Sequence, residues 1–243
     1  MMDKRGQIAI FVIISILIVG AIVGIIYFQN AKKTETSSNE LIKLAKADID
    51  SCVEESAGDA IYVISSQGGY VLPKDYLEDM NLRIAYWNIL GNNTSPSTET
   101  IQDQASATMC ALLDECIYLE KYNLNSTKGI CNASTVIRPD YAAFRVDFPI
   151  SVRFADKTTI FEKSSAVVYT RIGKAITVAR AIAADQSKHP GSLCLTCMAD
   201  IGQQNDMLID MGTKDNSTII RLIDQSADMN KTRAYELKFA MKI

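Results

Sequence analysis

The chain has 243 residues, a net charge of −3 and a pI near 5.3. It therefore lacks the basic footprint of a nucleic-acid-binding protein, and we expect no nucleic acid among its partners. With 48% hydrophobic and 22% charged residues, it is long enough for one globular domain with a sizeable core in addition to a membrane segment.

The N-terminal end combines a basic leader, residues 1–6, with a long apolar run. Residues 8–28 carry no charge and match the ~20 residues that a helix needs to cross a bilayer. A secretory signal has a shorter apolar core of roughly 7–15 residues that ends in small residues, whereas this run ends in Tyr27 and Phe28. We therefore expect residues 7–29 to form a retained transmembrane helix in the cell membrane.

Two glycines in this run, Gly20 and Gly24, have the spacing that lets two membrane helices approach closely. Small residues are also common in membrane helices generally. Self-association through Gly20 and Gly24 and a purely compositional origin therefore both stay open.

Glycosylation sequons are more frequent than chance predicts, six against about two. They begin at Asn92, Asn93, Asn125, Asn132, Asn216 and Asn230. Some of these sequons arise because Asn, Ser and Thr cluster in turns, but the excess favours an exported, glycosylated body.

Basic residues flank both ends of the apolar run, so the positive-inside rule gives almost no preference for either orientation. The sequons therefore decide the orientation: the N-terminus is predicted to be cytoplasmic and residues 41–243 extracellular.

All six cysteines follow the predicted span: Cys52, Cys110, Cys116, Cys131, Cys194 and Cys197. An even number suits three disulfides in an oxidising compartment, although six cysteines allow 15 connectivities. Local spacing suggests that Cys194 pairs with Cys197, and that Cys52 pairs with either Cys110 or Cys116.

The first half of the extracellular part is predicted to be helical. Residues 30–40 form a polar linker or a helix continuation. From Leu41 to Ile64, apolar residues recur every three or four positions, which predicts an amphipathic helix that stops at Gly68 and Gly69. If the linker is helical too, the span and this helix form one spine. An exposed loop over residues 91–100 and a second helix over residues 101–122 follow.

The second half changes to a period of two. Residues 141–172 alternate between apolar and polar side chains, which predicts two strands joined by a turn at "ADKTT". A helix is expected over residues 173–187, and then three strands at "DMLIDMG", "NSTIIRLID" and "RAYELKFAMKI". The predicted fold is α+β, with helices first and then an antiparallel sheet with a crossing helix.

Chemical motifs are sparse. His189 is the only histidine, which excludes a site with two imidazoles, and no phosphate-binding, nucleophile-elbow or zinc-protease motif occurs. Trp87 is predicted to lie in the core. We expect no enzyme activity, cofactor, metal site or small-molecule substrate.

The strongest chemical candidate is "CLTC", Cys194 to Cys197. A structural disulfide is favoured over a redox pair, because a redox pair begins a helix and this sequence context indicates none. It is also favoured over a zinc site, for which two further ligands are missing.

The stretch "KRGQIAIFVII" resembles an archaeal class III signal peptide, the type found in type IV pilins and archaellins. The resemblance implies cleavage by prepilin peptidase between Gly6 and Gln7, and an apolar helix that anchors the subunit before packing with its copies in a filament. At the fifth mature position, where many pilins have Glu, this chain has Phe11.

Four further stretches, "GQIAIFVII", "CVEESAGDAIYVISSQGGYV", "LRIAYWNIL" and "YELKFAMKI", resemble a group of single-span surface proteins of small-genome archaea, a likeness that supports the architecture more than a role.

The sequence thus predicts a non-enzymatic, pilin-like surface protein with a structural, adhesive or filament-forming role, which associates with the membrane through residues 8–28 and with itself or other pilin-like subunits. One alternative is a single-pass binding protein that does not polymerise. Another is an extracytoplasmic thiol oxidoreductase that uses Cys194 and Cys197.

Overall fold

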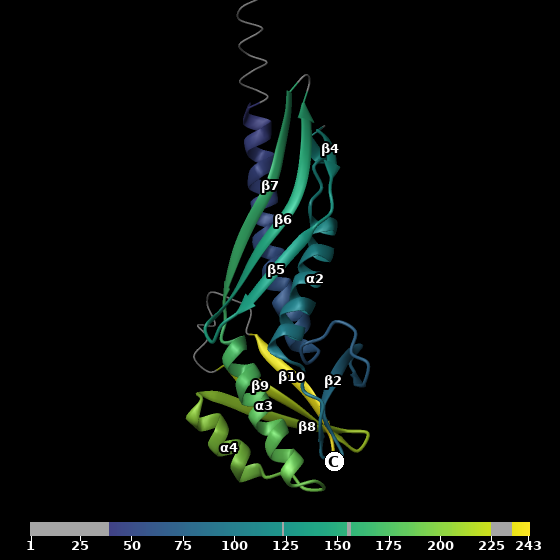
Figure 1. Ribbon diagram of the computed structural model, residues 1–243, viewed down its shortest axis with the longest axis vertical. Coiled ribbons are helices and arrows are strands. Elements are labelled where there is room, and N and C mark those ends of the chain that lie inside the picture. The colour runs from purple at the N-terminus through teal and green to yellow at the C-terminus, as the bar shows by residue number, and fades with distance from the viewer. Residues whose placement is uncertain (1–38, 123, 155–156, 225–234) are drawn as a thin grey trace, which may run out of the picture.

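The computed structural model describes residues 39–122, 124–154, 157–224 and 235–243. Gly6, Gln7, Gly20, Gly24 and Asn230 lie outside these ranges, as does the predicted span. None of the helices within these ranges has the length and apolar character to cross a bilayer. The molecule is elongated and α+β, with a long helix and a β-hairpin at one end and a second sheet at the other (Figure 1).

Residues 39–66 form the first helix, as the apolar spacing predicted. Its buried stripe consists of Ala45, Ile49, Val53, Ala57, Ala60, Ile61 and Ile64. The helix ends where Gly68 and Gly69 adopt φ of 73° and 87°, and the Gly69 N–H donates to the Ile64 carbonyl over 2.7 Å. At ~1.5 Å per residue, these residues extend over about 40 Å.

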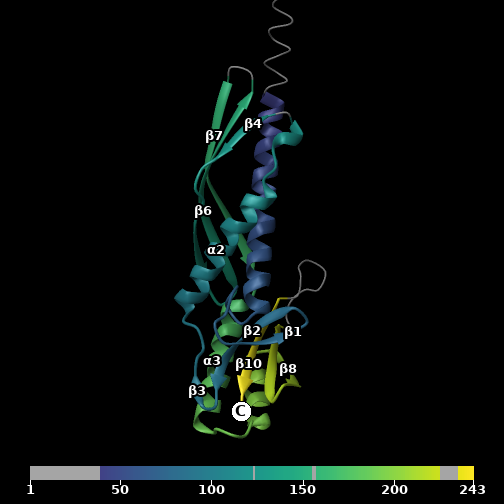
Figure 2. The ribbon, with the colours of Figure 1, turned by 90° about the vertical axis from the view of Figure 1, so that its right-hand side faces the viewer.

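An antiparallel four-stranded sheet lies along this helix. The central strand β6 (Tyr141–Phe154) pairs with β7 (Lys157–Tyr169) on one side, and with β4 (Asn125–Lys128) and β5 (Asn132–Ile137) on the other. The predicted hairpin is confirmed. Its inward residues Phe144, Val146, Phe148, Ile150 and Val152 are buried. Figure 2 shows the first helix and α2 (Thr98–Cys116) on the same face of this sheet.

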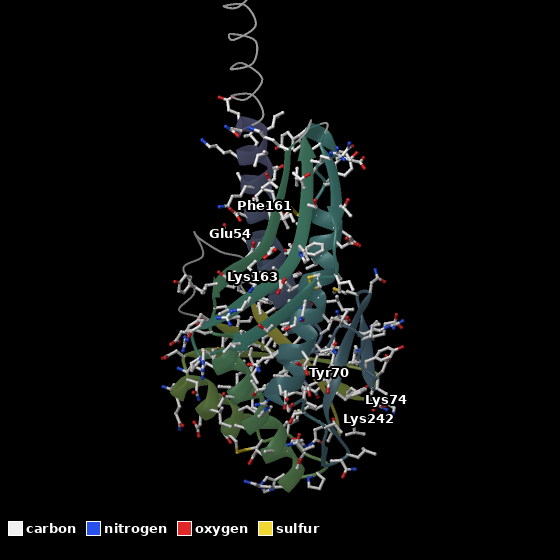
Figure 3. All side chains as sticks on the ribbon, turned by 45° about the horizontal axis from the view of Figure 1, so that its top comes forward. Glu54, Tyr70, Lys74, Phe161, Lys163 and Lys242 are labelled. Atoms are coloured by element: carbon white, nitrogen blue, oxygen red, sulfur yellow. A yellow bond between two sulfur atoms is a disulfide. The ribbon has the colours of Figure 1, made fainter. Side chains whose placement is uncertain are left out.

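The edge strand β7 also runs past the first helix. Phe161 of β7 lines a narrow gap together with Ile49 and Val53 of the helix. Figure 3 places Glu54 of the helix and Lys163 of β7 on this same flank. We call the first helix, α2 and β4–β7 the disulfide-tied region, for the two cross-links described below.

The second sheet is mixed, and it corrects the prediction of one antiparallel sheet after the helices. Its order is β1 (Tyr76–Asp79), β2 (Leu82–Ile89), β10 (Glu236–Lys242), β9 (Ser217–Asp224) and β8 (Met207–Lys214), with β3 (Asn92–Asn93) beside β2. The last strand, β10, lies parallel to β2 and antiparallel to β9. The three strands predicted at the end are confirmed, but β1–β3 precede α2.

Helices α3 (Ile172–Lys188) and α4 (Leu195–Gln204) accompany this sheet, and with β1–β3 and β8–β10 they form what we call the mixed-sheet region. The prediction of α3 is confirmed. Its Arg180 donates to the Pro96 carbonyl (2.7 and 3.1 Å) and to the Thr98 hydroxyl (2.8 Å), so it ties α3 to the start of α2. Burial lowers the pKa of Arg180.

The exposed loop predicted over residues 91–100 is confirmed in part: residues 92–94 are exposed and residues 94–97 form no helix or strand, but β3 occupies Asn92–Asn93 and α2 begins at Thr98. Ser97 caps the helix by accepting from the Thr100 N–H over 3.0 Å, and Pro96 is buried. The helix ends at Cys116, earlier than predicted, because Ile117 is extended (ψ 103°). Ile117 and Leu119 lie beyond the helix but are also buried. Their positions continue the apolar spacing of α2 in the sequence, which is why a longer helix was predicted.

The two regions share one continuous core. Trp87 of β2 is fully buried, as predicted, 4.9 Å from the Phe239 ring of β10. Their junction requires glycine at the start of α3. A Cβ on Gly173 would overlap the carbonyl group of Arg138, 2.6 Å from its carbon, at the turn between β5 and β6.

Candidate functional site

Two disulfides hold the disulfide-tied region together. Cys52 of the first helix pairs with Cys116, one of the two partners that the sequence allowed, over a separation of 64 residues. Cys110 of α2 pairs with Cys131, just before β5, over 21 residues. Each bond joins different elements, so each restrains how the helices and the sheet lie against one another.

A groove of about 270 Å³ opens beside Cys52 and Cys116. Asp48 and Glu55 supply carboxylates to its wall, and the Tyr122 hydroxyl donates to Asp48 over 2.8 Å. A hydrogen bond to Glu120, and then the charge of Glu120, raise the pKa of the exposed Tyr118. The wall of the groove also includes the apolar residues Ile49, Ile117 and Leu119.

The third disulfide, Cys194–Cys197, is local, with a separation of three residues. Here the structure corrects a step in the sequence argument, because this motif does begin a helix. Cys194 is the N-cap of α4, and its Sγ accepts from the Cys197 N–H over 3.2 Å. The Thr196 hydroxyl lies 3.6 Å from the same sulfur. Both cysteines are half-buried.

A second groove, of about 340 Å³, lies between α4 and β8, and Leu195 contributes to its wall. Leu195 is 58% exposed, and Leu208 and Met211 of β8 are also exposed. The helix can approach the strand because Gly202 has no side chain: a Cβ there would lie 2.8 Å from the Met207 carbonyl oxygen. Leu195 and Met198, the residues that follow Cys194 and Cys197 in the chain, thus bring the groove next to the first turn of α4, although neither cysteine lines it.

Every sequon asparagine within the described ranges is exposed. Asn92 and Asn93 lie in β3, Asn125 in β4, Asn132 in β5, and Asn216 in the turn between β8 and β9. Accessibility is what attachment of a glycan requires, and glycosylation of these residues stays a prediction. The lone histidine, His189, is exposed just after α3, as its polar context indicated.

The α4–β8 groove and the helix that begins at Cys194 were not predicted from the sequence. A signal was present, because Leu195, Met198 and Ile201 recur at three-residue intervals within a ten-residue helix. The preceding "HPGS" suggested a loop and obscured the point where the helix begins.

Comparison with known proteins gives no relative: no protein-family model, curated protein or solved structure matches the chain. The function is therefore inferred from the chain's own residues.

Proposed function

We propose that this protein is a membrane-anchored, pilin-like surface protein with a structural, adhesive or filament-forming role, whose N-terminus is cytoplasmic and whose residues 41–243 are extracellular. The observation that carries the proposal is the first helix. It follows shortly after the predicted span, and it packs its apolar stripe against a sheet while its other face is polar. An apolar segment joined to such a helix suits a subunit that is held in lipid before assembly and packs with its copies afterwards.

Two features of the body support an extracellular location. Three disulfides are typical of exported proteins, because cytosolic thiols are kept reduced. The exposed sequons at Asn92, Asn93, Asn125, Asn132 and Asn216 are accessible for modification outside the cell.

The test is the intact mass and N-terminal sequence of the full chain from its native membrane, with and without reduction. We expect a chain that begins at Gln7, a mass increment from glycans, and the added mass of six hydrogen atoms when the three disulfides are reduced. A Gly6→Leu variant should stay uncut, while Ser37→Ala, beyond the predicted span, should be processed as the wild type is. A wild-type chain that begins at Met1 or Met2 would contradict prepilin-type processing.

Assembly is tested separately, by electron microscopy of filaments sheared from cells and by cross-linking in the membrane. Substitution of both Gly20 and Gly24 by Leu should reduce cross-linked oligomers if these residues form the contact. The Ile10→Leu variant controls for a change in side-chain shape elsewhere in the run.

The second candidate, a single-pass binding protein that does not polymerise, is favoured by Phe11. In pilins, Glu at this mature position neutralises the terminal amine of a neighbouring subunit, and Phe11 lacks that charge. Correct processing without filaments would favour this candidate.

A further inference from the structure

The Cys194–Cys197 disulfide differs from the other two in what it restrains. Both of its cysteines belong to the first turn of α4, so its reduction releases no other element. Reduction of Cys52–Cys116 or Cys110–Cys131, by contrast, removes a covalent link between a helix and another element. The local disulfide is therefore free to cycle between oxidised and reduced forms within an intact fold.

The surroundings of Cys194 favour its thiolate once the bond is reduced. The Cys197 N–H and the Thr196 hydroxyl both lie within reach of the Cys194 sulfur, at 3.2 and 3.6 Å. Donors at a helix N-terminus lower the pKa of a thiol from its usual value of about 8.5. A thiol of lower pKa is also the better leaving group in disulfide exchange.

The adjoining groove supplies a surface for a substrate. Leu195 sits between the two cysteines in sequence and lines the groove, which continues over Met198, Met207, Leu208 and Met211. None of the described residues that line the groove is charged. Methionine side chains are flexible and polarizable, so such a surface adapts to different apolar side chains.

We propose that Cys194 and Cys197 form a thiol–disulfide exchange site that oxidises cysteine pairs in extended, apolar polypeptide segments bound in the α4–β8 groove. A substrate thiolate attacks Cys194 Sγ, so that the Cys194–Cys197 bond breaks and Cys197 leaves as a thiolate that takes up a proton. The second substrate thiolate then attacks the substrate sulfur of the mixed disulfide and expels Cys194 as the thiolate.

Two electrons pass from the substrate dithiol to the protein, the substrate gains a disulfide, and Cys194 and Cys197 end reduced. A low-molecular-weight disulfide, which is reduced to two thiols, restores the site. This activity requires an oxidising location but no filament, so it does not depend on prepilin-type processing or assembly.

The first experiment uses the purified full chain, oxidised glutathione, and a synthetic peptide with two cysteines flanked by Leu and Phe. We expect the wild type to oxidise the peptide at least tenfold faster than the Cys194→Ser/Cys197→Ser variant. With oxidised glutathione and a matched peptide that has only one cysteine, the single variant Cys197→Ser should accumulate a mixed disulfide between Cys194 and the peptide, because neither a second peptide thiol nor Cys197 is present to resolve it. Equal rates for wild type and double variant would overturn the proposal.

Groove binding is tested by Leu195→Ser, which should raise KM for the peptide severalfold. The matched control is Ile130→Ser, which removes a side chain that is 88% exposed between β4 and β5 and should leave KM for the peptide unchanged. Equal KM values for the two variants would overturn the assignment of the groove as the substrate site.

The pKa of the Cys194 thiol is tested by mild reduction and alkylation with iodoacetamide at graded pH. Mass spectrometry then gives the pH midpoint of alkylation for each cysteine. Cys194 and Cys197 should be labelled before the other four cysteines, and Cys194 should react with a midpoint below about 8.5. Thr196→Val should raise this midpoint. Labelling of Cys194 last, or a midpoint at or above the ordinary value, would contradict the proposal.

Discussion

The disulfide-tied region and the mixed-sheet region are stabilised in different ways. In the disulfide-tied region, β6 buries one face against the helices and exposes the other, where Arg145, Asp147 and Arg153 lie. In the mixed-sheet region, β2 buries consecutive residues such as Ile84 and Ala85 on both faces. The disulfides that join different elements therefore occur where those elements share a single buried face, whereas the strands that are covered on both faces are held by close packing.

The largest effect is expected from Phe239→Ala, which tests how much close packing stabilises the mixed-sheet region. Phe239 is fully buried against Trp87 in the central strand β10, so its truncation should cost roughly 3–5 kcal/mol of unfolding free energy. The measurement is denaturation followed by circular dichroism. Tyr169→Ala, at a residue 77% exposed, is the control and should change stability by less than about 0.5 kcal/mol. Similar losses of unfolding free energy in Phe239→Ala and Tyr169→Ala would contradict the view that close packing stabilises the mixed-sheet region.

Removal of the Cys52–Cys116 disulfide tests how much the covalent links stabilise the disulfide-tied region. In the chain-entropy description, a disulfide closing a loop of this length contributes about 4 kcal/mol, so Cys52→Ser/Cys116→Ser should lose about that much. Hydrogen exchange should accelerate first in residues 39–66 and α2, while β9 and β10 keep their protection. Cys110→Ser/Cys131→Ser provides the matched comparison, with about 3 kcal/mol for its shorter loop. Faster hydrogen exchange confined to β9 and β10 would contradict this prediction.

The junction between the regions is tested by Gly173→Ala. Alanine gains up to about 1 kcal/mol in helix propensity, but its Cβ overlaps the Arg138 carbonyl group, and such overpacking costs about 1–3 kcal/mol. We therefore expect a net loss of about 1–2 kcal/mol, seen as a lower melting temperature. The control Gly212→Ala places a Cβ with no atom within 4 Å and should not lower it. An unchanged melting temperature for Gly173→Ala would mean that the two regions can shift apart freely.

The smallest effect is expected from Cys194→Ser/Cys197→Ser. This disulfide closes a loop within one turn, so the same entropy description gives it less than about 2 kcal/mol. Denaturation of this variant beside Cys52→Ser/Cys116→Ser checks the order directly. A loss as large as that of the longer loop would show that the local bond also stabilises the fold.

The sequence predicted the elements that bury one face. The stripe of residues 41–64, the alternation in β6 and the apolar face of α3 each give a period that matches a helix or a strand half exposed to solvent. The three final strands were predicted from the same alternation. Their order in the sheet was not, because pairing of β10 with β2 depends on contacts distant in the chain.

The strands that the sequence missed lack such a period in their apolar residues. β2 shows no alternation because it is covered on both sides, and β1, β4 and β5 span only four to six residues. Of the candidate site, spacing identified the Cys194–Cys197 pair, but the groove beside it depends on the approach of α4 to β8 at Gly202. That approach is a tertiary contact with no local signature.

The central position of β10 determines the order in which the chain can fold during synthesis. Translation proceeds at roughly 5–20 residues per second, and β2 emerges long before residues 236–242 exist. Until then, β2 and β9 each have an open edge at the place that β10 will occupy. The helices and the β6–β7 hairpin, which pair locally, are complete earlier. These open edges therefore need protection against pairing with other nascent strands, and that need ends only when β10 enters the sheet.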